Sequence, residues 1–164
     1  MKKITFLALL SVLTLSSIAQ NKFGHINAQE ILLLMPETKQ AEIALNEKST
    51  TIQNVLSSMY AELEAIKINF QQNEANWDDL QKQDEQAKYQ SIADRIQLYE
   101  KNGETDYNKL QQDLLTPINT KLRDAITAVA EEGGYIYIFA DEILHHKDEK
   151  NDVSALVKKK LGLE

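Results

Sequence analysis

The chain has 164 residues, 25 of them acidic and 18 basic, with no cysteine, five glycines and two prolines. An ordinary globular protein carries about 12% glycine and proline together, so this scarcity argues against turn-rich sandwiches, barrels and doubly wound α/β domains. The absence of cysteine excludes disulfides, thiolate metal sites, a cysteine nucleophile and a lipoprotein anchor. The acidic balance argues against a nucleic-acid partner.

The N-terminal residues have the pattern of a secretory signal peptide. Two lysines precede an apolar stretch that ends at Ile18, and Ser17 and Ala19 place small side chains at the −3 and −1 positions of a cleavage site. The stretch is shorter than the ~20 residues that span a bilayer. We therefore expect residues 1–19 to be cleaved, in preference to the alternative of a transmembrane anchor. No second apolar run of spanning length follows, so the mature protein is expected to lack a stable membrane insertion. Two lysines before a short apolar run are typical of a bacterial signal, which predicts a periplasmic location.

The first part of the mature chain predicts a short strand and then a helix. Strand character extends over Phe23–Asn27, and Asn27 followed by Glu30 is typical of a capping box that starts a helix through Ile31–Met35. Pro36 ends this helix or begins the next one.

The middle of the chain predicts long helices with coiled-coil seams. From Glu37 to Asn102 there is no glycine or proline, and the composition favours helix. A first seam with three–four spacing, interrupted at Ser49, comprises Leu45, Ile52, Leu56, Met59, Leu63, Ile66 and Phe70. A second seam, which shifts phase after Gly103, comprises Tyr89, Ile92, Ile96, Tyr99, Gly103, Tyr107, Leu110, Leu114, Ile118, Leu122, Ala125 and Val129. Pro117 lies inside the second seam and is expected to kink it.

Residues 71–86 separate the two seams and lack their periodicity. The simplest arrangement is an antiparallel hairpin that turns between Asn73 and Asp79, with Asp78 or Asp79 capping the returning helix. One uninterrupted helix over 37–131 is the alternative.

The C-terminal part predicts a second strand and a final helix. Gly133 and Gly134 are expected to end the returning helix, and Tyr135–Ala140 reads as a strand buried on both sides. A polar loop over 141–151, with a possible short strand at 143–145, precedes a helix over Val153–Leu161.

The predicted fold class is mainly α with a small β body, in which a long antiparallel coiled-coil hairpin projects from a short-stranded oligomerisation body. We assign 20–36 and 132–164 to the body and 37–131 to the hairpin. So few short strands are not stable alone, so strands of several subunits are expected to share one core. The residues expected in that oligomer core are Phe23, Ile26, Ile136 and Ile138.

Three segments resemble the Skp/OmpH family of periplasmic chaperones. They are the opening FGHINAQEILLLMPE, the run LLTPINTKLRDAITAVAEEGGYIYIFADE and the closing DVSALVKKKLG, in the order and separation of the family. The resemblance implies a homotrimer whose three hairpin tentacles enclose a cavity for unfolded outer-membrane proteins. The best-known members are basic, whereas residues 37–101 hold twelve acids and seven bases. Long-range attraction of acidic clients and lipopolysaccharide binding are therefore not expected.

Two aromatic residues near the hairpin turn are candidates for client contact. Phe70 continues the first seam, so packing within the hairpin is its alternative role, whereas Trp77 lies beyond the periodic region. The basic run Lys158–Lys160 is interpreted as complementing the dipole at a helix C-terminus, with an anionic-lipid patch as the alternative.

The polar loop contains residue types that ligate zinc, namely Asp141, Glu142, His145, His146 and Asp148. Adjacent histidines on an extended segment point to opposite faces, so we interpret the loop as solvated and predict no metal site. His25, on the first strand, is interpreted as a surface residue.

Three functions are then compared: an ATP-independent holdase chaperone, a structural coiled-coil scaffold of the envelope, and an enzyme. The sequence presents no nucleophile–base pair, phosphate loop or paired catalytic carboxylates, so we expect neither catalysis nor a cofactor. The resemblance favours the holdase. The broken seams and polar turn also suit a flexible arm better than a rigid scaffold.

Overall fold

The computed structural model describes residues 21–163, so the expected signal peptide lies outside the described residues. These residues form two compact units. One contains the described residues up to Leu32 together with those from Lys121 onward, and the other contains Leu33–Thr120. Within 21–163, no helix is both long enough and apolar enough to cross a membrane.

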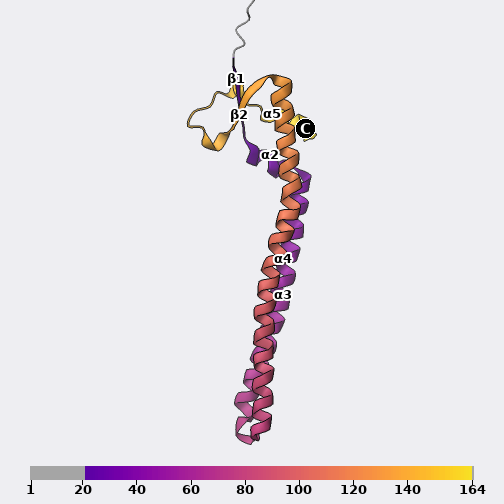
Figure 1. Ribbon diagram of the computed structural model, residues 1–164, viewed down its shortest axis with the longest axis vertical. Coiled ribbons are helices and arrows are strands. Elements are labelled where there is room, and N and C mark those ends of the chain that lie inside the picture. The colour runs from indigo at the N-terminus through magenta and orange to yellow at the C-terminus, as the bar shows by residue number, and fades with distance from the viewer. Residues whose placement is uncertain (1–20, 164) are drawn as a thin grey trace, which may run out of the picture. The chain divides into compact units, whose positions relative to one another are not determined.

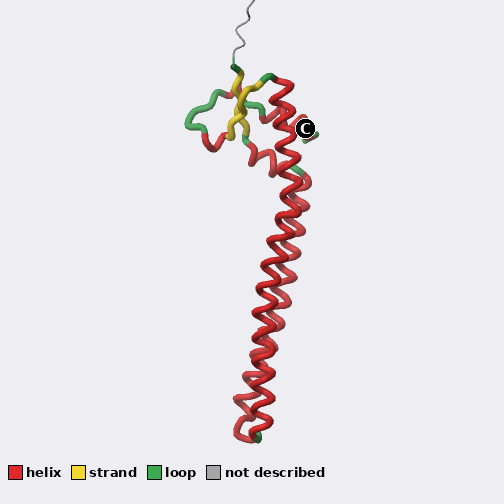
Figure 2. Tube along the Cα trace, viewed as in Figure 1, coloured by secondary structure: helices red, strands yellow, loops and turns green. Residues whose placement is uncertain are grey.

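The first unit is built on a two-stranded parallel sheet (Figure 2). Strand β1 (Lys22–Ile26) pairs with β2 (Tyr135–Ala140), with Gly24 opposite Ile138. Among the described residues β2 has no other partner strand, so its outer edge is unpaired.

Helix α2 (Ala28–Leu34) begins at a side-chain cap, as the sequence predicts. The backbone N–H of Glu30 donates to Asn27 Oδ1 at 2.9 Å. The reciprocal half of the expected capping box is replaced, because the Asn27 N–H donates to Ser154 Oγ at 3.1 Å and the Glu30 carboxylate pairs with Lys158. The N-terminus of α2 is thereby tied to the C-terminal helix.

The segment after β2 differs from the expected loop. Two short 3-10 helices, η3 (Asp141–Ile143) and η4 (Glu149–Asn151), occupy it, and the possible strand at 143–145 is not formed. Helix α5 (Ser154–Leu161) starts where the Asp152 carboxylate accepts from the Ser154 N–H at 2.7 Å. It ends at Gly162, whose φ of 70° is the left-handed conformation of a helix C-terminus.

The second unit is an antiparallel pair of helices (Figure 1). Helix α3 (Pro36–Asn73) leads through the 3-10 helix η2 (Glu74–Asn76) to α4 (Asp79–Gly133), whose first part belongs to this unit. Lys48 Nζ bonds Asp106 Oδ2 at 3.1 Å, and Tyr60 Oη bonds Glu100 Oε1 at 2.8 Å, both from α3 to α4. The hairpin prediction is confirmed, and the alternative of one uninterrupted helix is wrong.

The predicted seams face one another inside this pair. The α3 seam residues are half-buried, and Ile92 and Ile96 of α4 are buried, whereas Tyr89 is exposed. A Cβ at Gly103 would lie 3.2 Å from Ile52 Cγ2, so glycine permits a close approach of the helices at the phase shift.

A capping box closes the turn of the hairpin. The Gln81 N–H donates to Asp78 Oδ1 at 2.8 Å, and the Asp78 N–H donates to Gln81 Oε1 at 3.0 Å. Asp78 is therefore the cap of α4. Farther along, Pro117 lies within the same continuous helix, and the kink expected there stays a prediction.

Candidate functional site

An aromatic cluster covers one face of the small sheet. The rings of Phe23 and Tyr137 stack with centroids 6.1 Å apart, and Phe139 lies 6.5 Å from Phe23. All three side chains are exposed, Tyr137 at 59%. A single chain does not bury β2 on both sides, because Tyr137 on one face and Ile136 on the other are more than half exposed.

The residues expected in an oligomer core divide into two groups within one chain. Ile136 is 52% exposed and Phe23 is exposed, whereas Ile138 is half-buried and Ile26 is 3% exposed. Ile26 thus belongs to the interior of a single chain. The others leave apolar surface on a sheet that also has an open edge, and such an edge can pair with another chain.

The two aromatic candidates at the hairpin turn contact each other. Phe70 and Trp77 meet edge to face, with centroids 5.7 Å apart and an interplanar angle of 74°. Both side chains are half-buried. No pattern in the sequence indicates this partner of Trp77, because the contact depends on the 3-10 turn η2, which places the indole against the end of the seam.

An open groove of about 420 Å³ lies between α3 and α4 next to Phe70. Its apolar lining comes from Ile66, Phe70 and Tyr89, and Lys67 and Glu85 supply charge of both signs at its margin. A groove with this lining can bind an apolar side chain of another polypeptide, whether that polypeptide is acidic or basic overall.

Other apolar side chains stand exposed along this unit, outside the seam: Leu33, Leu34, Ile43, Tyr60, Ile68, Leu80 and Leu98. Leu33 and Leu34 are adjacent in α2, and the other five are spread singly over α3 and α4. Such spacing offers many small contacts in place of one contiguous patch.

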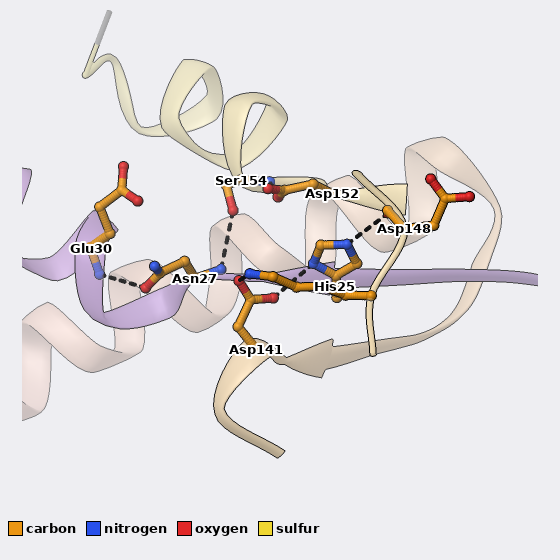
Figure 3. A network of polar contacts seen from close by, with 8 residues as sticks. His25, Asn27, Glu30, Asp141, Asp148, Asp152 and Ser154 are labelled. Carbon is orange, nitrogen blue, oxygen red and sulfur yellow. Dashed lines mark hydrogen bonds and ion pairs between the residues drawn. The ribbon is translucent and has the colours of Figure 1, made fainter. Parts of the chain in front are cut away.

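His25 occupies a buried polar network in the first unit (Figure 3), so the interpretation of it as a surface residue is wrong. Its Nδ1 lies 2.7 Å from Asp141 Oδ1, and its Nε2 lies 2.9 Å from the carbonyl oxygen of Asp148. The side chains of His25 and Asp141 are only 5% and 10% exposed. Lys147 bonds the second carboxylate oxygen of Asp141.

The network shifts the pKa values of its members in opposite directions. Burial disfavours the charged imidazole, but the hydrogen bonds to Asp148 and Asp141 outweigh it, so the pKa of His25 is raised. Burial likewise disfavours the Asp141 carboxylate, but Lys147 and His25 outweigh it and lower the pKa of Asp141. Both shifts favour the charged forms.

The loop residues with metal-ligating side chains do not form a ligand set. Asp141 serves His25 and Lys147, and Asp148 accepts from His25 and caps η4. Within residues 21–163 no three His, Cys, Asp or Glu side chains are placed to hold a metal ion.

The lysines at the end of α5 make ion pairs within the first unit. Lys158 pairs with Glu30, and Lys160 pairs with Glu132. All three lysines of the run lie in the last turn of α5, where they complement the negative end of the helix dipole. These contacts agree with the interpretation that the lysine run complements the dipole at the end of the helix.

A long antiparallel helical hairpin in a chain with a two-stranded parallel sheet defines a class of α-helical hairpin proteins with a small β body. The profile of the family described as outer membrane protein (OmpH-like) matches residues 22–161. The chain therefore belongs to the OmpH-like family, as the resemblance indicated.

A solved structure shares the fold. It is described as an OmpH-like candidate outer membrane chaperone from Caulobacter crescentus CB15. It is 13% identical to this chain, with a TM-score of 0.74 over 87% of this chain and 85% of that one. No match was found among curated proteins.

Proposed function

We propose that this protein is an ATP-independent holdase chaperone of the periplasm, which binds unfolded outer-membrane proteins between the hairpins of a homotrimer. The match to the OmpH-like family over residues 22–161 carries the proposal. The shared fold with a structure described as a candidate outer membrane chaperone supports it.

The surface of the small sheet supports the assembly. Two strands do not make an independently stable sheet, and the exposed Phe23, Ile136 and Tyr137 leave apolar area that water disfavours. A second and third copy placed against this surface would bury it and pair the open edge of β2. We propose 20–36 and 132–164 as the segments that assemble and 37–131 as the arm.

The hairpin surface supports client contact without charge attraction. Removal of residues 1–19 would leave 16 basic and 25 acidic residues, about −9 per subunit. Such a surface does not draw acidic chains over a distance. Attraction must then come from short-range apolar contacts, which the groove beside Phe70 and the exposed side chains of the hairpin can provide.

Dilution of an unfolded β-barrel protein from urea tests this function. With the protein present at one trimer per client, light scattering should be suppressed without ATP. Suppression should persist from about 20 to about 200 mM salt, a range over which the Debye length falls severalfold, because apolar contacts are little affected by screening.

The control is an equal mass of an unrelated acidic coiled coil, which should not suppress scattering. If this protein leaves aggregation unchanged at equimolar trimer, the holdase proposal is wrong and an envelope scaffold becomes the better function. A protection that collapses with salt would show that capture depends on a basic surface, contrary to the role proposed for apolar contacts.

A further inference from the structure

The geometry around His25 requires two protons on its ring. The Asp148 carbonyl oxygen, 2.9 Å from Nε2, can only accept a hydrogen bond, so Nε2 must donate. The Asp141 carboxylate, 2.7 Å from Nδ1, accepts as well when ionised. Lys147 bonds the other oxygen of Asp141 and favours that ionised form. Both contacts are therefore satisfied at once only by the imidazolium.

This ring joins β1 to the segment that begins with η3. Asp141 lies 116 residues from His25 along the chain and Asp148 lies 123 residues away. The backbone of the same segment also reaches β1, since the Val153 N–H donates to the His25 carbonyl oxygen at 2.9 Å and Asp152 forms an isolated parallel bridge with His25. Residues 148–153 thus lie against the edge of β1 that β2 does not use.

We infer that His25 and Asp141 form a pH-sensitive latch that holds residues 148–153 against this edge of β1, and that loss of the His25 proton to solvent releases the segment. The neutral ring keeps its Nε2 proton and its bond to Asp148. Its Nδ1 lone pair then faces the Asp141 carboxylate at a distance where a donor is needed. An unmet contact between two buried acceptors disfavours the closed arrangement.

The other charged groups near the ring do not counteract the destabilising effect of deprotonating His25. On β2, the residue paired with His25 is Phe139, which is uncharged. The charged residues on the segments packed against His25 are Asp141, Glu142, Lys147, Asp148, Glu149, Lys150 and Asp152. Of these, Asp141 and Asp152 act directly on the charge of His25, and both favour its protonated form. Lys147 is exposed and acts through Asp141.

The direction of the pH dependence follows from the two shifts. Because the pKa of His25 is raised in the folded protein, its contribution is complete below the ordinary value of about 6.5 and is lost as the pH rises through the folded value. Because the pKa of Asp141 is lowered, its contribution is lost only as the pH falls through that lowered value. The latch is closed between these two limits.

The test combines two measurements on the full mature chain. Ring-nitrogen NMR shifts report the protonation of His25, and backbone hydrogen exchange, corrected for the intrinsic rate, reports the protection of residues 148–153. At about pH 6.5, the ordinary pKa of histidine, we expect more than half of the His25 rings to carry two protons. Above it, protection should fall in step with the His25 titration, by up to tenfold for each unit between its folded and unfolded pKa.

Two variants separate the latch from other titrations. His145→Gln combined with His146→Gln removes two exposed imidazoles from the same loop and should leave the pH response unchanged. His25→Gln should lower protection and remove the response. A His25 ring that is no more than half protonated at about pH 6.5, or protection that does not follow its titration, would overturn the inference. The wild-type comparison decides this even if His25→Gln fails to fold.

Discussion

Replacing Ile136 with Asp is expected to disrupt assembly while leaving the single chain little affected. Ile136 is 52% exposed in one chain, so the new carboxylate would be solvated there. In the proposed interface it would be an unpaired charge in apolar surroundings. Loss of a central interface contact costs about 2–4 kcal/mol, which weakens each subunit contact by about 30- to 700-fold. Sedimentation velocity should show the trimer replaced by smaller species.

The matched control is Leu98→Asp. Leu98 is 59% exposed and lies on α4 within the helical hairpin, far along the chain from either strand. The Leu98→Asp substitution introduces the same charge at a similarly exposed position, and this variant should assemble as the wild type does. Equal assembly of the two variants would contradict the proposal that the strand surface joins the subunits.

Shortening the hairpin by two heptads should preserve assembly and reduce client protection. The contact of Ile52 with Gly103 and the groove shared by Phe70 and Glu85 give the register of the two helices. Deleting 57–70 together with 85–98 follows this register and keeps the seam phase. The body contains neither segment, so the trimer should form. Protection in the urea-dilution assay should fall by at least about half, because a shallower cavity encloses less of the client.

An equal deletion elsewhere controls for the loss of the groove itself. Removing 43–56 with 99–112 shortens the hairpin equally but retains the groove lined by Ile66, Phe70 and Tyr89. The cavity mechanism predicts a similar loss for both deletions. Full protection by both shortened proteins would contradict it.

The elements of the hairpin could be predicted because their determinants are local. The seam repeats every three to four residues, and the capping box joins residues only three apart, Asp78 and Gln81. Each helix therefore carries its own start and its own buried stripe. The same holds for the strands, whose apolar runs are bounded by polar residues or glycine.

The sites were harder to predict because their partners are distant in sequence or on another chain. His25 reads as a surface residue until Asp141, 116 residues later, is brought beside it. The contact of Phe70 with Trp77 depends on the geometry of η2. For β2, an apolar run indicates burial but does not indicate whether the same chain or another subunit buries the strand. A single chain leaves Ile136 and Tyr137 exposed.

The most direct test of the proposed holdase is native mass spectrometry with one outer-membrane β-barrel protein in two states. The purified protein is mixed with this client either diluted from urea or already folded in detergent. We predict a complex of one trimer with the unfolded client and no complex with the folded one, since only the unfolded chain offers apolar segments to the hairpins. Failure to bind the unfolded client, or equal binding of both states, would contradict the proposed function.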